Sequence, residues 1–305
     1  MSDEPDETES AAAPTDAAEN AADEVASAEV VPEAAASIEE PAQIRASKSR
    51  SRLGSAISLG FSLAGKGFLA KASIGLAVLT TFGAIAVALL LARGDAPPLA
   101  SVPGLTASAL AWGGGFTFAV AAAARAFDRD ATEGIRFLSR TRGVSLGTYA
   151  IGRVFGLALA LILIVGVGSL VTGGVCATIA SSSRGSIGRA TLATAAYAIG
   201  FGVLMAPLAA ATLGARGRTR GYVILIALLV VPEVLQDSID SIPERWRSLF
   251  GIPSALDALR DSLTPARFDG PLAAAAALVI LVTAAVAMMF AVEQALRATR
   301  TAEGR

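Results

Sequence analysis

A glycine-rich run near the start of the chain has almost the spacing of a nucleotide-phosphate loop. Gly60, Gly65 and Lys66 match the pattern GxxxxGK, in which a Ser or Thr must follow the lysine to hold magnesium. Gly67 stands at that position and has no hydroxyl, and no apolar strand is predicted before the run. We therefore expect that this chain does not bind a nucleotide or hydrolyse ATP by itself.

The residue types that most often perform catalysis are scarce. The 305 residues include no histidine, which removes the commonest general base and the commonest metal ligand. The one cysteine, Cys176, lies in an apolar run, so neither an internal disulfide nor a paired-cysteine metal site is expected. Beyond the first 40 residues the carboxylates are scattered singly. The composition therefore predicts no catalytic site, no metal site and no cofactor in this chain.

A few polar residues in apolar surroundings remain as candidates. Glu233 is the only carboxylate well inside an apolar context, and a carboxylate within a membrane is a candidate for function. Its nearness to the end of an apolar run argues against such a role. Thr194 and Tyr197 either line a substrate path or serve structure, since hydroxyls in membrane helices often bond their own backbone carbonyls. The sequence leaves both possibilities open.

The apolar residues that surround these side chains come in blocks of membrane-spanning length. Hydrophobic residues make up 53% of the chain and the mean hydropathy is +0.59. A helix needs about 20 apolar residues to cross the roughly 30 Å hydrocarbon core. The intervals between charges predict six spans, at about residues 72–92, 105–124, 154–178, 190–214, 221–235 and 271–292. The fifth is only about 22 Å long at a rise of 1.5 Å per residue.

Basic residues show which ends of these spans face the cytoplasm. With both termini inside, 18 of the 25 Lys and Arg residues lie on the inner side and seven on the outer side, as the positive-inside rule requires. Residues 1–40 hold 13 carboxylates and no basic residue, whereas the remainder holds 13 carboxylates and all 25 basic residues, a net charge of +12. Residues 1–50 are thus predicted to form a disordered acidic cytoplasmic tail.

Two further elements complete the predicted fold, which is all-α and polytopic. An apolar stripe that includes Leu53, Phe61 and Phe68 predicts an interfacial helix before the first span. Between the last two spans, residues 252–263 are predicted to form a short extracytoplasmic helix. Gly152 and Gly156 match GxxxG, which favours close helix packing, either inside the bundle or along a dimer seam.

The charged stretch between the second and third spans carries the strongest functional signal. It contains an acidic residue next to glycine, then a short amphipathic segment, a polar turn and Tyr149-Ala-Ile-Gly152-Arg153 at the start of the third span. In this order the stretch resembles the permease subunits of type-2 ABC exporters. The six spans, the interfacial helix and the outer loop extend the resemblance over about residues 50–300.

The resemblance implies a membrane-spanning permease subunit of an ATP-driven exporter in the cytoplasmic (inner) membrane. Its residues 128–142 would form a coupling helix that docks on a separate ATPase subunit, which would hold ATP and Mg²⁺. The contact residues carried over from the family are Asp130, Glu133, Gly134, Arg136, Phe137, Leu138 and Arg140. The expected partners are that ATPase, a second copy or a related permease, and the lipid membrane, with no nucleic acid.

Three alternatives stay open at this point. The charged stretch could be a solvated loop whose arginines only set the orientation of the spans. The chain could instead be a non-transporting scaffold that recruits partners through its acidic tail. A membrane-embedded enzyme is a third reading, against which the missing histidine counts.

Overall fold

The chain was analysed as a computed structural model. The structure describes residues 42–93, 99–124, 126–180, 184–214, 218–236, 238, 247, 249–263 and 271–303. Residues 1–41, most of the predicted acidic tail, lie outside this part of the chain. The side chains of Arg136 and Arg140 lie outside it as well, although their backbone is described.

The described ranges contain helices and turns and no strand, which confirms the all-α prediction. The helices are α1 Ala42–Ala64, α2 Phe68–Leu91, α3 Val102–Ala109, α4 Phe116–Ala123, α5 Ala126–Thr132, α6 Ile135–Thr141, α7 Leu146–Ile179, α8 Arg184–Ala209, α9 Arg218–Gln236, α11 Ile252–Ser262 and α12 Pro271–Glu303. A 3₁₀ turn, η1 (Leu99–Ser101), precedes α3, and π-helical turns η2 (Leu110–Gly115) and η4 (Ala210–Gly214) follow α3 and α8.

Six of these helical segments are long and apolar enough to cross a membrane, which confirms the predicted number of spans. They cover Phe68–Leu91, Leu99–Ala123, Leu146–Ile179, Arg184–Gly214, Thr219–Gln236 and Ala275–Val292. The fifth span is longer than the predicted 221–235, because α9 has 19 residues, beginning at Arg218 and ending at Gln236. At 1.5 Å per residue it is about 28 Å long, so it needs no thinned membrane.

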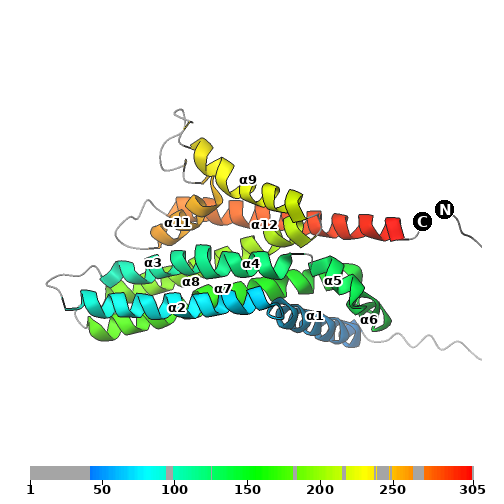
Figure 1. The fold of residues 1–305 in the computed structure, drawn as a ribbon, viewed down its shortest axis with the longest axis horizontal. Coiled ribbons are helices and arrows are strands. Elements are labelled where there is room, and N and C mark those ends of the chain that lie inside the picture. Colours follow the sequence, from blue (N-terminus) through cyan, green and yellow to red (C-terminus); the bar gives the residue numbers. More distant parts are fainter. Residues whose placement is uncertain are drawn as a thin grey trace, which may run out of the picture. The chain divides into compact units, whose positions relative to one another are not determined.

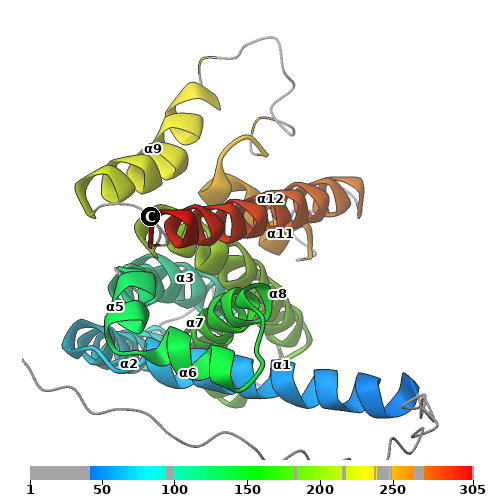
Figure 2. The ribbon, with the colours of Figure 1, turned by 90° about the vertical axis from the view of Figure 1, so that its right-hand side faces the viewer.

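The spans differ in how much of their surface the protein itself covers. The most apolar windows of the second, third and fourth spans are 50%, 56% and 67% buried, against 11%, 17% and 22% for the first, fifth and sixth. Segments α2, α3, α4, α7 and α8 run side by side (Figure 1). The helix α9 packs against η4 and α11 and stands apart from α7 and α8 (Figure 2). The first, fifth and sixth spans therefore leave most of their apolar surface for lipid or for other chains.

The centre of the bundle is formed where the second span packs between its neighbours. Gly114 lies against Ala77 of α2, and Gly115 lies against the ring of Phe201 of α8, so added Cβ atoms would be 2.9 and 3.0 Å from those groups. Trp112 meets the same Phe201 ring edge-on at 5.5 Å. These residues fall in the π-helical turn η2, whose widened backbone lets a small-residue run contact helices on both sides.

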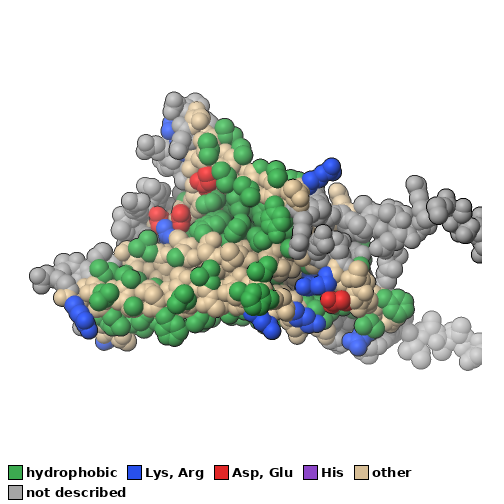
Figure 3. Space-filling model, viewed as in Figure 1, with side chains coloured by type: hydrophobic (Ala, Val, Ile, Leu, Met, Phe, Trp, Pro, Cys, Tyr) green, Lys and Arg blue, Asp and Glu red, His purple; other side chains and the backbone are tan. Residues whose placement is uncertain are grey.

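The elements predicted from the charged stretch lie together at one end of the bundle. Helices α5 and α6 form a hairpin there, and α1 packs against the adjoining end of α7 (Figures 1 and 2). Helix α1 begins at Ala42, so residues 42–50 are helical although they were assigned to the tail. The face of the molecule in Figure 3 shows basic side chains gathered mainly at this end, and hydrophobic side chains along the spans.

Candidate functional site

The charged stretch folds into two short helices rather than the single predicted helix. Gly134 separates α5 from α6 with a φ of 70°, and Gly143 ends α6 with a φ of 69°. Both angles are in the left-handed region that glycine enters without a steric penalty, which is why helices commonly stop at such residues. The third span then starts cleanly, because the Ser145 side chain accepts a hydrogen bond from the Thr148 N–H at 3.1 Å.

A buried ion pair holds the base of this hairpin. The Asp130 side chain of α5 is fully buried, and that of Arg153 on α7 is only 6% exposed. The Arg153 Nε donates to Asp130 Oδ2 at 2.8 Å, and its Nη2 donates to Oδ1 at 3.3 Å. The guanidinium and the carboxylate thus meet in a two-point fork, the strong geometry for this pair.

Two further groups complete the polar cluster around Asp130. Tyr149, one helical turn before Arg153 and on the same face of α7, donates its hydroxyl to Asp130 Oδ2. The third nitrogen of the Arg153 guanidinium, Nη1, donates to the carbonyl of Gly60 on α1 at 3.3 Å. One arginine therefore joins three elements, α5, α7 and α1, and we call Asp130, Tyr149, Arg153 and Gly60 the anchor cluster.

The backbones of α1 and α7 approach each other closely beside this cluster. A Cβ added to Gly60 would overlap the Gly152 carbonyl, and one added to Gly156 would overlap the backbone of Phe61 and Gly60. The Gly152–Gly156 pair thus packs a helix of its own chain, so in the described structure the GxxxG spacing serves packing within the bundle. The crossing also holds the Gly60 carbonyl where Arg153 can reach it.

The other predicted contact residues lie on the outer part of the hairpin. Phe137 and Leu138 are 70% and 55% exposed. Glu133 is exposed, in the turn that follows α5, and lies 3.9 Å from Arg129, four residues before it. Gly134 forms the turn between the two helices, whereas the Asp130 carboxylate faces its own chain and offers no surface to a partner. The structure thus divides the predicted set into an inward anchor and an outward apolar pair.

Tyr149 and Arg153 were not assigned a binding or positioning role from the sequence. Arg153 was used as the basic residue of the resemblance and as a residue that sets orientation, and the apolar part of the third span was predicted to start after it. A recognisable signal was present, because Tyr149 and Arg153 stand four residues apart at the head of an apolar run. Such spacing places both side chains on one helix face.

The predicted intramembrane carboxylate, Glu233, serves at the other end of the bundle as a cap for α11. Its Oε1 accepts a hydrogen bond from the Ser254 N–H at 2.8 Å, and its Oε2 accepts from Gln236 Nε2 at 2.9 Å and from the Ser254 hydroxyl. A carboxylate at a helix N-terminus satisfies free N–H groups and meets the positive end of the helix dipole. Glu233 therefore fastens the end of α9 to α11.

Helix α11, which confirms the predicted helix before the last span, carries a second charged cluster. Arg260 donates to Ser108 Oγ of α3 at 2.7 Å and lies 3.1 Å from both Asp257 and Asp261. Its guanidinium also stands over the Tyr197 ring of α8, 5.6 Å from the centroid. Burial raises the pKa of Asp257, and the Arg260 guanidinium partly offsets the rise.

Thr194 and Tyr197 are both fully buried in α8. The Thr194 hydroxyl donates to the Thr191 carbonyl of its own helix at 2.7 Å, and the Tyr197 ring supports Arg260. Both contacts are structural, as one of the two sequence readings proposed. The structure thus brings Tyr197 to the α11 cluster, whereas the Thr194 hydroxyl bonds within its own helix.

Together the fold and these contacts define a multi-pass α-helical membrane protein with an anchored hairpin at one end and a capped short helix at the other. No protein-family model matches the chain, and no curated protein matches it.

Proposed function

We propose that this chain is the membrane-spanning permease subunit of an ATP-driven transporter of the ABC type, with the α5–α6 hairpin as its contact to a separate ATPase subunit. The observation that carries the proposal is the exposure of Phe137 and Leu138 on a hairpin whose base is fixed by the buried Asp130–Arg153 pair. The six apolar helices supply the membrane domain that such a subunit needs.

The buried pair argues against a loop that only sets orientation. Removing a carboxylate and a guanidinium from water costs several kcal/mol per ion, which only close geometry and further hydrogen bonds offset. A solvated loop with surface arginines would satisfy the positive-inside rule without that cost. The anchor cluster instead makes α5, α7 and α1 move together, as a part that transmits displacement from a soluble partner to the spans should.

The exposed pair on α6 fits a docking surface. An aromatic and an aliphatic side chain that are largely free of intramolecular contacts can enter a pocket on a partner, where such anchors supply most of the binding energy. The alternating charges nearby, Arg129 and Glu133, would lie at the rim of the contact.

The rest of the proposed assembly follows from the same resemblance and from the charge distribution. Two permease chains, identical or related, would pair with two ATPase subunits that hold ATP and Mg²⁺ and drive export. The basic end of the bundle, with the hairpin and both termini, would face the cytoplasm of a cell with an inner membrane.

Purification in mild detergent followed by mass spectrometry tests the contact. A soluble ATPase should co-purify with the unaltered chain and be lost when Phe137→Ala and Leu138→Ala are combined, by roughly tenfold or more for a hot-spot pair. Phe68→Ala is the matched control, because Phe68 is 83% exposed at the start of α2 and lies outside the hairpin. Equal recovery of the ATPase with the unaltered chain, the double variant and the Phe68→Ala control would refute the docking surface.

Two additional variants distinguish the transporter from the scaffold. Charge reversal by Arg136→Glu with Arg140→Glu should weaken the ATPase association, while deletion of residues 1–40 should leave it unchanged. A scaffold that acts through its acidic tail predicts the opposite pair of results.

A further inference from the structure

A long apolar groove opens between the first and third spans. It has a volume of about 700 Å³ and is lined by α2, by α7 and by the end of α1. Its walls are side chains spaced four residues apart on facing helices: Ile74, Val78 and Phe82 from α2, and Leu163, Val167 and Val171 from α7. From Lys71 to Phe82 the groove follows α2 for about 16 Å, roughly the depth of one membrane leaflet.

The interior of the groove suits a hydrocarbon chain. The hydroxyls that reach it are already used, because Thr81 donates to the Ala77 carbonyl and Ser62 donates to the Leu59 carbonyl, each at 2.9 Å. A polar ligand would therefore lose its hydrogen bonds to water on entering these walls and find few replacements.

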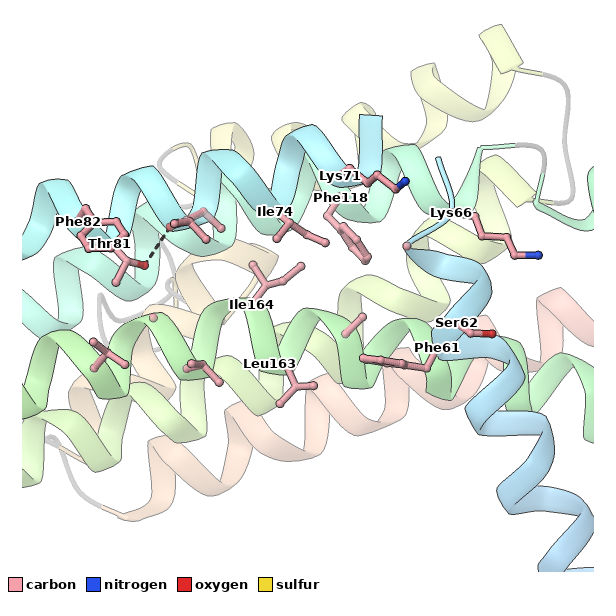
Figure 4. A pocket seen from close by; sticks show the side chains of 17 residues that line it. Phe61, Ser62, Lys66, Lys71, Ile74, Thr81, Phe82, Phe118, Leu163 and Ile164 are labelled. Carbon is pink, nitrogen blue, oxygen red and sulfur yellow. Dashed lines mark hydrogen bonds between the residues drawn. The ribbon is translucent and has the colours of Figure 1, made fainter. Parts of the chain in front are cut away.

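Both ammonium groups of the groove stand at one end. Figure 4 shows Lys66 and Lys71 beside α1, with Thr81 and Phe82 at the opposite end. Both lysines are exposed, and among the residues that the structure describes neither has an ion-pair partner within 4 Å. The α1–α7 crossing at Gly60 and Gly156 brings the end of α1, and with it Lys66, beside the apolar walls.

We propose that this groove binds an anionic phospholipid of the leaflet on the hairpin side, with an acyl chain between α2 and α7 and the phosphate at Lys66 and Lys71. Apolar walls of one leaflet's depth, ending at two lysines that have no ion-pair partner in the described part of the chain, match both parts of such a molecule. Basic residues at a membrane surface attract anionic lipids, and long lysine side chains reach the interface while their stems stay in apolar surroundings. The proposal gives a role to Lys66, which has none once a nucleotide-phosphate loop is excluded. It does not depend on the proposed transport activity.

Native mass spectrometry of the full chain tests the proposal. The chain is reconstituted with equal amounts of phosphatidylglycerol and phosphatidylcholine of the same acyl chains, then released from its membrane and weighed with its retained lipid. Phosphatidylglycerol should be retained preferentially. Lys66→Gln with Lys71→Gln should weaken that preference by roughly 30-fold, the sum of two surface contacts.

The matched control is Arg184→Gln with Arg189→Gln, which also removes two positive charges but at the other end of the bundle. It should leave the preference for phosphatidylglycerol unchanged. Equal losses in the two double variants would mean that total charge rather than the groove selects the lipid, which would overturn the proposal. If the double lysine variant does not fold, Lys66→Gln alone should still lower the preference by roughly fivefold.

The acyl chain is tested separately. Val167→Trp should fill the groove and release both lipids, because Val167 is half-exposed in its wall, whereas Val279→Trp on the exposed face of α12 should not. Displacement of phosphatidylglycerol by millimolar inorganic phosphate would identify a free-anion site and contradict the proposal. Loss of a dimer from the Val167→Trp variant, with lipid retention unchanged, would show that a second copy fills the groove.

Discussion

Asp130 and Arg153 illustrate how one pair of residues can connect a surface hairpin to membrane-spanning helices. Either side chain alone would be an unpaired charge in a water-excluded position, since Asp130 is fully buried and Arg153 almost so. Together with the Tyr149 hydroxyl and the Gly60 carbonyl, the carboxylate and the guanidinium satisfy most of each other's hydrogen-bonding capacity. The pair therefore fixes the position of α5 against α7 more than it adds net stability. The favourable free energy of pairing largely offsets the cost of removing the two charges from water.

Loss of one member of this pair should be costly. Asp130→Asn leaves the Arg153 guanidinium buried without a counter-charge and should lower the free energy of unfolding by about 3 kcal/mol or more. Thermal unfolding in detergent measures the loss. Glu133→Gln, which breaks the partly exposed pair between the turn after α5 and Arg129, should cost less than about 0.5 kcal/mol. Similar unfolding temperatures for the two variants would show that the buried pair is not an anchor.

Among the helices, α1 has a role that its amphipathic sequence does not suggest. The predicted stripe of Leu53, Phe61 and Phe68 indicates a helix on a membrane surface, but α1 ends at Ala64, so Phe68 belongs to α2. In addition, Gly60 is in backbone contact with α7. Helix α1 is thus clamped at one end by glycine packing and by Arg153, and it closes one end of the lipid-sized groove. Helices α9 and α11 are joined in a comparable way at the opposite end, where Glu233 caps α11.

Alanine substitutions at two glycines of α1 distinguish the effect of helix packing from that of intrinsic helix preference. Gly54→Ala should stabilise the protein by up to about 1 kcal/mol, because nothing lies near the added methyl and alanine is the better helix former. Gly60→Ala should destabilise it by about 1–3 kcal/mol, because the methyl overlaps α7. Thermal unfolding of the two variants compares them directly. If Gly60→Ala were as harmless as Gly54→Ala, the α1–α7 crossing would be looser than described.

For the molecule as a whole, the distribution of charge and burial defines two ends and two kinds of helix. The second, third and fourth spans form the covered centre, and the first, fifth and sixth present apolar surface. The hairpin, α1 and many basic residues share one end, and the proposed function places that end in the cytoplasm, as the positive-inside rule predicts.

Site-directed labelling checks this orientation. In a Cys176→Ala background, Ser238→Cys should react with a membrane-impermeant maleimide in intact cells, and Thr141→Cys should react only after the cells are opened. Both positions are exposed, so accessibility depends on the side of the membrane rather than on burial. The reverse pattern would place the hairpin outside and exclude contact with a cytoplasmic ATPase.

The sequence was sufficient to predict the number of spans, because insertion into hydrocarbon depends on local composition. Each span therefore appears in the sequence as a long apolar run without charged residues. The boundaries were less accurate where a charge is paired. The third span was expected to begin at Val154, but α7 starts at Leu146, since Asp130 neutralises Arg153 and lets the helix continue past it. The fifth was likewise expected to begin only at Gly221, after the last arginine of the preceding loop, whereas α9 already begins at Arg218.

Contacts between distant segments could not be predicted in this way. Nothing local in the run from Asp128 to Arg153 shows that Asp130 faces inward while Phe137 and Leu138 face outward. That difference depends on where α7 and α1 lie. The widened turn at Leu110–Gly115 was equally unforeseen, because its glycines also fit an ordinary helix.

The glycine contact between α1 and α7 also sets an order of events during synthesis. Gly60 leaves the ribosome 96 residues before Gly156, so α1 has no packing partner while two spans and the hairpin are made. At common elongation rates that interval lasts roughly 5–20 s. During this time α1 depends on its own apolar stripe to stay at the membrane surface. The apolar stripe would thus keep α1 at the membrane surface until α7 is made. The glycine contact would then fix α1 against α7 in the finished protein.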